Sequence, residues 1–567
     1  MENKQQFQNI WNRIYGSQYN QILEKFISEL QQFKQSVESQ PLENEWYKDV
    51  TVYSVYVDLF NKDFKGLEDK LDYLSELGVS CLWLLPVLDS PMRDAGFDIK
   101  DYRKIRPDLM GGNTENSEFE TFLKTAHNKG IKVIFDIAIN HVSEENFWFQ
   151  QAKKSKDNPY RDYFIWSKEP DKYLDARIIF KGIEESNWQK CGDEYFFHRF
   201  FDFQPDLNYR NPQVLIEMTR NMLYWLSIGV DGFRADAIPY LWKEEGTECE
   251  NLQGTHDVVK FFRLVLDYIR PNTLMLAEAC QKPIEVIKYF GSGDECHAGY
   301  HFPLMPMIFK SLAAESSQAV KNVLSHEITP EIPDTAQWFT FLRCHDELSL
   351  ELVYVSEEDR KFIHESYCKN PIWNFREGQG ISSRLSELMD KNPQKIALAY
   401  SIMLSLPGTP VIYYGDEFGK LNDEKYYQEM IRVNGKDDTR FLVRGRIDWQ
   451  ELENELKNPE SYTSQVFEKV KNLIVSRKKF KAFGRGKIEW LTPKNVENQD
   501  IDSILMYKRR FEKEEILIIQ NLSNQTVELK IEGLLLSNPV RDLLGNSLNF
   551  NSQNASIIVN PVGYYWI

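Results

Sequence analysis

The chain has 567 residues, of which 42% are hydrophobic and 27% are charged, and these values exclude a disordered or fibrous protein. The 85 acidic residues outnumber the 68 basic ones, so the formal net charge is −17, which argues against nucleic acid or an anionic membrane surface as a partner. The N-terminal stretch lacks the apolar core of a signal peptide, no apolar run is long enough to span a membrane, and the seven cysteines form no CxxC pair. We therefore expect a cytoplasmic protein with reduced thiols.

Residues 1–45 are expected to form a helical N-terminal segment. Apolar side chains recur every three or four positions between Ile22 and Val37, the spacing of an amphipathic helix that packs on one face. Pro41 ends the pattern. The segment carries no residues that indicate chemistry.

From residue 46 onward, short apolar strands alternate with helical stretches, which indicates an α/β fold. Eight such strands over about 430 residues predict a (β/α)₈ barrel. A doubly wound open sheet is the alternative, but no GxGxxG follows an early strand. The expected strands are 51–57, 80–87, 132–137, 230–237, 273–279, 299–304, 338–346 and 409–417.

Two excursions interrupt the alternation, and both are far longer than an ordinary βα loop. Residues 141–205 are expected to form an inserted subdomain, so that the catalytic barrel comprises 46–140 and 206–484. The second excursion, 347–385, follows the seventh strand and is expected to form a lid. Past residue 485 the helical period ends, and alternating apolar and polar residues predict a C-terminal antiparallel β-sandwich over 485–567.

Charged and imidazole side chains follow several of the expected barrel strands, at the end where barrel enzymes place their catalytic groups. A lone aspartate after a strand is usually a helix cap. Repetition at one end of the same barrel instead indicates an active site. The residues are Asp136, Asn140 and His141 after the third strand, Arg234 and Asp236 after the fourth, Glu278 after the fifth, and His345 and Asp346 after the seventh.

Three of these carboxylates suit the cleavage of a glycosidic bond, which needs a carboxylate on one face of the sugar C1 and a proton donor at the leaving oxygen. Asp236 is the better nucleophile, because Arg234 lies on the same side of the strand and keeps the carboxylate ionised. Glu278 follows an apolar run, so burial can raise its pKa as an acid requires. Asp346 is suited to hold sugar hydroxyls. This chemistry requires no cofactor.

The motifs FDIAINH (135–141), GFRADA (232–237), LAEA (276–279) and FLRCHD (341–346) stand in the order seen in the α-amylase superfamily of retaining glycoside hydrolases, which the chain resembles from about residue 49 onward. The resemblance implies that Asp236 is the nucleophile, Glu278 the acid/base and Asp346 the third acid. It also implies sugar binding by Asp98, Phe97, His141, Arg234 and His345. Phe97 stands where the family usually has tyrosine, and Cys344 where it usually has asparagine.

Longer blocks, such as DGFRADAIPYL (231–241) and LSLPGTPVIYYGDE (404–417), look like the trehalose synthases, which interconvert maltose and trehalose. That resemblance implies a small disaccharide or oligosaccharide as substrate, a site closed against water, and a lid arginine at Arg384. Other segments, including DDTRFLVRGRIDW (437–449), look like amylosucrases. An α-glucosidase or α-amylase-type hydrolase and a sucrose-acting transglucosidase are therefore alternatives. A third alternative is a catalytically inactive barrel that serves as a binding or transporter subunit. Such a protein would have lost the three acids, which this chain keeps.

The trehalose synthase pattern also implies a structural calcium ion. Its ligands would be the side chains of Asn140 and Asp206 and the carbonyls of Tyr240 and Leu241, an all-oxygen set that suits calcium. At the position where the pattern has its next acidic ligand, this chain has Lys243, whose ammonium has the wrong charge to coordinate an ion. The alternative is that Asn140 and Asp206 hold the inserted subdomain in place by hydrogen bonds.

Overall fold

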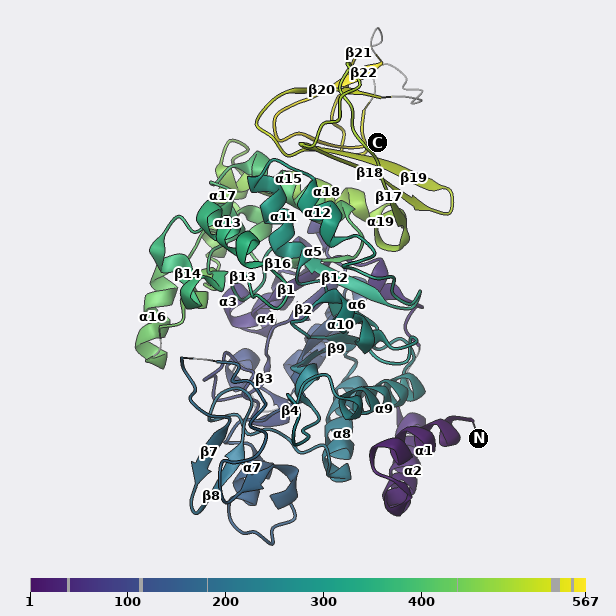
Figure 1. The fold of residues 1–567 in the computed structure, drawn as a ribbon, viewed down its shortest axis with the longest axis vertical. Coiled ribbons are helices and arrows are strands. Elements are labelled where there is room, and N and C mark those ends of the chain that lie inside the picture. Colours follow the sequence, from purple (N-terminus) through teal and green to yellow (C-terminus); the bar gives the residue numbers. More distant parts are fainter. Residues whose placement is uncertain are drawn as a thin grey trace.

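The computed structural model describes residues 2–37, 41–111, 116–180, 182–435, 437–531, 541–551 and 555–567. At its centre eight parallel strands form a closed barrel in the order β1-β16-β12-β11-β10-β9-β5-β2, which confirms the predicted fold (Figure 1). The strands are β1 (Val52–Val55), β2 (Cys81–Leu84), β5 (Lys132–Ala138), β9 (Gly232–Asp236), β10 (Leu274–Ala277), β11 (Ala298–Tyr300), β12 (Gln337–Phe341) and β16 (Thr409–Tyr413).

Helices surround the barrel and bury the outer faces of its strands. A well-defined example is α8 (Pro212–Ile228), where the Asn211 side chain accepts a hydrogen bond from Gln213 N and Gly229, at φ 117°, ends the helix in the left-handed region. The other helices of the barrel region, not all of which contact the strands, are α3 (Val57–Asn61), α4 (Phe64–Asp69), α5 (Leu71–Leu77), α6 (Ser117–Asn128), α9 (Gln253–Ile269), α10 (Pro283–Val286), α11 (Leu304–Ala313), α12 (Gln318–Val323), α15 (Pro393–Ser405), α16 (Glu424–Asn434), α17 (Trp449–Leu456), α18 (Tyr462–Lys478) and α19 (Ala482–Arg485).

The N-terminal segment forms two helices, α1 (Glu2–Ile14) and α2 (Asn20–Ser36), which separate at Gly16 with a φ of 80°. Both helices pack on α9 of the barrel. The rings of Phe7, Trp11 and Phe26 lie 5.7–6.1 Å from the ring of Phe261, between centroids. The pair therefore packs on one side of the barrel wall and contributes no residue to the cavity lining described below.

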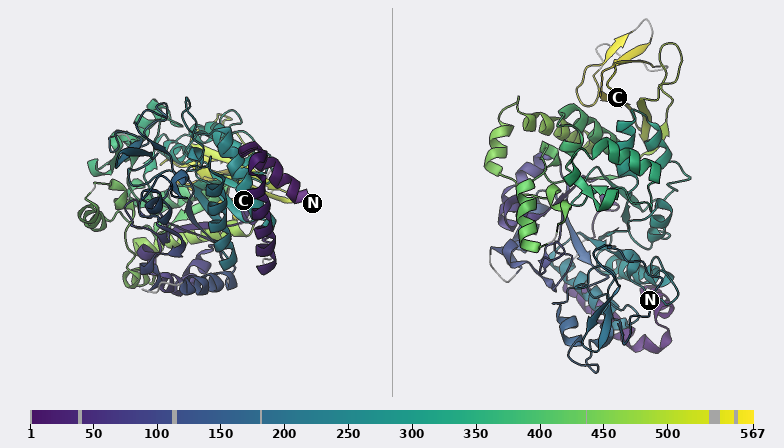
Figure 2. Two further views of the ribbon diagram at one scale, coloured as in Figure 1. Left: turned by 90° about the horizontal axis from the view of Figure 1, so that it is seen from below. Right: turned by 60° about the vertical axis from the view of Figure 1, so that its left-hand side comes forward.

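The two excursions contain small elements of their own. The segment 141–205 holds α7 (Phe147–Ala152) and a three-stranded antiparallel sheet in the order β6-β8-β7. Its strands are β6 (Trp166–Ser167), β7 (Trp188–Cys191) and β8 (Glu194–Phe197), and they lie at the end of the molecule opposite to the C-terminal sheets (Figures 1 and 2). A short hairpin, β3 (Leu88–Asp89) with β4 (Asp101–Ile105), precedes this segment. The segment 347–385 holds β13 (Leu348–Ser349), α13 (Glu357–Tyr367), β14 (Asn374–Phe375) and β15 (Gly380–Ile381), and α14 (Leu385–Leu388) follows.

The C-terminal region consists of two antiparallel sheets, which confirms the predicted sandwich. Apolar side chains from both sheets, including Ile504, Ile519, Leu529 and Ile557, form a core between them. One sheet contains β17 (Lys487–Trp490), β18 (Ile504–Phe511), β19 (Glu514–Asn521) and β23 (Tyr564–Trp566). The other contains β20 (Val527–Lys530), β22 (Ser556–Val559) and β21 (Asn549–Asn551).

A buried polar seam joins the sandwich to helix α15 of the barrel. Arg509 Nη1 donates to the carbonyl of Ser405 (2.7 Å), and Gln520 Nε2 and Trp566 Nε1 donate to Ser401 Oγ (2.9 and 3.0 Å). All five residues are fully buried, so these contacts fix the sandwich to the barrel without solvent. Among the helices of the described ranges, none has the length and apolar character needed to cross a membrane.

Candidate active site

A cavity of about 500 Å³ opens at the C-terminal ends of the barrel strands, and its size is within the range of small-molecule sites. The strand ends, the inserted segment 141–205 and the excursion 347–385 all contribute to its wall. The lining includes Arg234, Glu278, His345 and Asp346 from the strand ends, Tyr240 from the loop after β9, Phe180 from the inserted segment, and Glu347, Phe375 and Arg376 from the excursion.

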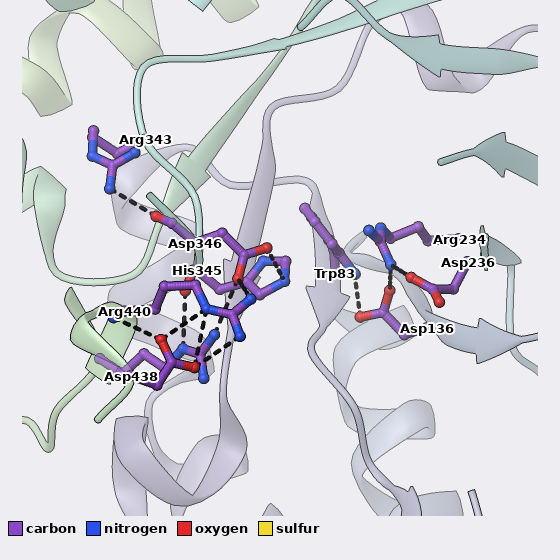
Figure 3. A network of polar contacts seen from close by, with 10 residues as sticks. Trp83, Asp136, Arg234, Asp236, Arg343, His345, Asp346, Asp438 and Arg440 are labelled. Atoms are coloured by element: carbon purple, nitrogen blue, oxygen red, sulfur yellow. Dashed lines mark hydrogen bonds and ion pairs between the residues drawn. The ribbon is translucent and has the colours of Figure 1, made fainter. Parts of the chain in front are cut away.

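Arg234 connects two strands beneath this cavity. Its Nη1 lies 2.7 Å from Asp136 Oδ1 and 2.8 Å from Asp236 Oδ1, and Trp83 Nε1 donates to the other oxygen of Asp136 at 2.9 Å (Figure 3). Burial opposes the charge on Arg234, but the carboxylates of Asp136 and Asp236 outweigh it and raise the pKa of Arg234 well above its ordinary value. A permanent cation therefore faces the Asp236 carboxylate, as its role as a nucleophile requires.

Glu278 directly follows β10 and faces the residue after Asp236. Its Oε2 accepts a hydrogen bond from the backbone N of Ala237 at 3.2 Å, and Ala237 adopts the left-handed conformation with φ 58°. Burial raises the pKa of Glu278 to about 7, with Arg234 acting in the opposite direction and Asp236 adding to the rise. A substantial fraction of Glu278 is therefore protonated near neutral pH, which suits a general acid.

Asp346 is held by one imidazole and two guanidinium groups. Its Oδ2 lies 3.0 Å from His345 Nε2, and its Oδ1 lies 3.2 Å from Arg440 Nη1 and 3.1 Å from Arg444 Nη2. Burial alone would raise the pKa of Asp346, but these neighbours outweigh it and hold the pKa well below its usual range. Arg440 is itself fixed by Asp438, whose Oδ2 lies 2.8 Å from Arg440 Nη2 (Figure 3).

Arg440 and Arg444 belong to the site but were not predicted from the sequence. Both lie in the block DDTRFLVRGRIDW, which indicated only a resemblance to amylosucrases. Glu347, which immediately follows Asp346 and lines the cavity, was not predicted either. Burial, with a further contribution from Asp346, raises the pKa of Glu347 to about 7.

The predicted sugar-binding residues lie around this centre in different settings. Phe97 stacks on His345, with ring centroids 5.9 Å apart and an angle of 28°, and the Arg234 guanidinium carbon lies 5.6 Å from the Phe97 ring centroid. His141 Nε2 lies 3.4 Å from Gln204 Nε2. The centroid of the His141 ring is 5.0 Å from that of Phe200, which lines the cavity. Their contact with sugar stays a prediction.

Asp98 is fully buried, and both of its oxygens are engaged within its own loop. Oδ1 accepts from Ser90 Oγ at 2.9 Å and from Asp94 N at 3.2 Å, and Oδ2 accepts from Arg93 N at 3.1 Å. Asp98 therefore organises the loop that carries Phe97. Its direct binding of sugar stays a prediction.

Arg384 does not lie at the cavity, where a lid arginine would have to be. Its side chain is fully buried, and Nη1 donates to the carbonyl of Tyr414 at 2.5 Å and pairs with Asp416 at 3.1 Å. It is absent from the cavity lining, whereas Arg376 of the same excursion is present in it. Arg384 directly precedes α14, and its backbone N donates to Asn422 Oδ1 at 2.7 Å, so the chain directs its side chain inward.

The residues predicted to bind calcium do not fit a calcium ion, because an ammonium group lies among them. Lys243 Nζ is 2.7 Å from Asn140 Oδ1 and 2.8 Å from Asp206 Oδ2, and all three side chains are buried. Tyr240 and Leu241, whose carbonyls would complete the set, lie at the end of the 3-10 helix Ile238–Tyr240, two to three residues before Lys243. The Lys243 ammonium supplies the positive charge that a metal ion would otherwise bring to the carboxylate and amide oxygens.

The chain matches two families of known proteins. Residues 31–486 match "Alpha amylase, catalytic domain", and residues 494–566 match "Maltogenic Amylase, C-terminal domain". The solved structure of the α-amylase from H. orenii superposes with a TM-score of 0.70, at 23% identity, over 92% of this chain and 99% of that one, which shows the shared fold.

Several curated relatives carry the name trehalose synthase. "Trehalose synthase/amylase TreS" of Mycolicibacterium smegmatis is 45% identical over 392 residues, which cover 67% of this chain and 64% of the relative. "Trehalose synthase" of Thermus thermophilus is 39% identical over 511 residues, which cover 85% of this chain and 51% of the relative. The chain thus spans less than two thirds of the length of either relative. Together with the barrel and the arrangement of its acids, these matches show that the chain belongs to the α-amylase family.

Proposed function

We propose that the protein transfers an α-glucosyl unit through a covalent glucosyl-enzyme intermediate and interconverts maltose and trehalose. The observation that carries the proposal is the pair formed by Asp236, which faces the Arg234 guanidinium at 2.8 Å, and Glu278, whose pKa burial raises to about 7. One carboxylate is thus suited to attack and the other to donate a proton. The names of the two trehalose synthase relatives support the choice of substrates.

In the first step, the Asp236 carboxylate attacks C1 of the bound glucosyl unit while Glu278 donates its proton to the departing glycosidic oxygen. In the second step, Glu278 takes a proton from a hydroxyl of the released glucose, and that oxygen attacks C1 and displaces Asp236. Two inversions give retention of the α configuration. A bond to the anomeric hydroxyl of the released glucose yields trehalose, and a bond to its 4-hydroxyl yields maltose.

Transfer rather than hydrolysis requires that water be kept from the intermediate. The excursion 347–385 supplies Glu347, Phe375 and Arg376 to the cavity wall. The Arg376 guanidinium carbon lies 4.6 Å from the ring centroid of Phe180, which belongs to the inserted segment 141–205. The two excursions therefore meet above the acids, and this roof supports a site in which a released glucose stays bound.

The test is to incubate the protein separately with maltose, trehalose and sucrose and to separate the products by chromatography. The proposal expects trehalose from maltose, maltose from trehalose, a minor amount of free glucose and no reaction with sucrose. Asp236→Asn is the control, and it should remove all products. Glucose as the main product from maltose would favour a hydrolase, and fructose release from sucrose would favour a sucrose-acting transglucosidase. Either outcome would contradict the proposal.

A further inference from the structure

Three consecutive residues, Cys344, His345 and Asp346, place a sulfur, an imidazole nitrogen and a carboxylate oxygen within 4.8 Å of one another. They follow strand β12, and all three line the cavity. We propose that this cluster binds a borderline-soft divalent cation of the zinc type, and that the bound ion inhibits the enzyme.

The donor set selects the kind of metal. Zinc binds thiolate sulfur at about 2.3 Å and imidazole nitrogen at about 2.0–2.1 Å, and it accepts carboxylate oxygen as well. Three protein ligands leave the fourth tetrahedral position to water, as in open zinc sites. Calcium and magnesium prefer all-oxygen sets, so they are poor occupants of a site with a thiol and an imidazole.

The donor atoms keep coordination capacity while both arginine contacts of Asp346 stay in place. Arg440 and Arg444 both contact Oδ1 of Asp346, which leaves Oδ2 to His345 and to an ion. His345 is 4% exposed, and its Nδ1 has no hydrogen-bond partner among the described residues. Because the three side chains face the cavity, an ion can enter along the route that the sugar takes.

The surroundings make the site inhibitory rather than structural. A cysteine thiol must release its proton when it binds a metal, which limits the affinity of the site. The Arg440 and Arg444 guanidinium groups beside Asp346 repel a divalent cation and limit its affinity. An ion bound here would withdraw His345 and Asp346 from the sugar, so metal and sugar should compete. This competition rests on the proposed function, whereas the binding of metal does not.

The first experiment measures binding without catalysis, with Co²⁺ as a spectroscopic substitute for Zn²⁺. The wild type should show the near-ultraviolet absorption of a thiolate–cobalt bond, and added Zn²⁺ should remove it. Cys344→Asn, which restores the residue usual in the family, should lack the band. Cys280→Ser is the matched control, because Cys280 also lines the cavity but lies outside the cluster, and it should keep the band. Absence of the band from the wild type, or its loss in Cys280→Ser, would overturn the proposal.

The second experiment measures inhibition of turnover of an aryl α-glucoside. Zn²⁺ should raise the apparent KM with little effect on kcat, EDTA should reverse the effect, and Ca²⁺ and Mg²⁺ should leave the rate unchanged. Cys344→Asn should need a Zn²⁺ concentration at least about tenfold higher, since loss of even an outer partner costs roughly 10–100-fold in metal affinity. Equal inhibition of wild type and variant would overturn the proposal. If Cys344→Asn fails to fold, Cys344→Ser takes its place in both experiments. If maltose and trehalose are not the substrates, the cobalt band alone decides whether the cluster binds metal.

Discussion

Arg440 Nη1 lies 3.2 Å from Asp346 Oδ1, although 94 residues separate the two in the chain. The contact joins the loop before Arg444 to the end of strand β12 and places a guanidinium at the edge of the cavity. Because Asp438 fixes Arg440 from the other side, the orientation of Asp346 depends on a chain of ion pairs rather than on one neighbour.

Arg440→Ala should weaken sugar binding and leave the protein folded. The change removes one of the two guanidinium groups that hold Asp346, and a hydrogen bond to a charged group contributes about 1.5–3 kcal/mol, so KM should rise by about tenfold or more. Steady-state kinetics on maltose measure this. Arg446→Ala is the matched control, because Arg446 is exposed and pairs with Glu429, and its KM should stay at the wild-type value. Equal effects of the two substitutions would show that Arg440 has no role at the site.

The pH profile of kcat/KM should fall on the alkaline side near pH 7. Glu278 must carry a proton to act as an acid, and burial raises its pKa from the ordinary 4.5 to about 7. Activity is therefore present below this pKa and is lost as the pH rises through it. In Glu278→Gln, the residual reaction with an activated aryl α-glucoside should lose this alkaline limb. If the limb persists in the variant, another group is responsible for it.

Removal of calcium should leave the stability of the wild type unchanged, whereas removal of the Lys243 ammonium should lower the stability. EDTA should not shift the Tm, because Lys243 supplies the cation beside Asn140 and Asp206. Lys243→Ala leaves the buried Asp206 carboxylate without its partner and should lower the free energy of unfolding by about 3–5 kcal/mol. Lys156→Ala removes an exposed lysine that pairs with Glu194, and it should change the free energy of unfolding far less. A Tm that falls with EDTA in the wild type would contradict this assignment.

Arg376→Ala should raise the fraction of free glucose formed from maltose more than it lowers total maltose consumption. The side chain lines the cavity and meets Phe180 of the inserted segment, so its loss opens the roof to water. The measurement is the ratio of glucose to trehalose. Arg384→Ala provides the contrast, since it breaks a buried pair with Asp416 and should lower the Tm while leaving the product ratio unchanged. A changed ratio in Arg384→Ala alone would return the lid role to that residue.

The barrel and its acids could be predicted from sequence because the information is local. Each strand is a short apolar run, and each acid lies at or within a few residues of the end of its strand, so the closure of eight strands brings Asp236, Glu278 and Asp346 to one end. The contact of Arg234 with Asp236 is also local, because residues two apart on a strand face the same side.

The rest of the site depends on packing between distant segments, which spacing along the chain does not encode. Arg440 reaches Asp346 only because the fold brings into contact two segments that lie 94 residues apart in the chain. The pattern that indicated a calcium site identified Lys243 as a misfit, but it did not show that the ammonium lies between Asn140 and Asp206. Arg384 belongs to the predicted lid in sequence, yet the backbone turn before α14 buries it against Asp416.

The seam between α15 and the C-terminal sheets bears on how modules can be exchanged between members of this family. Ser401 and Ser405 belong to the barrel, whereas Arg509, Gln520 and Trp566, which bond to them, belong to the sandwich. A grafted sandwich without counterparts of Arg509, Gln520 and Trp566 would leave the buried Ser401 hydroxyl and Ser405 carbonyl without these donors, at a cost of about 1–3 kcal/mol for each group. An exchange that keeps these contacts therefore has to move the sandwich together with α15, which precedes the last barrel strand.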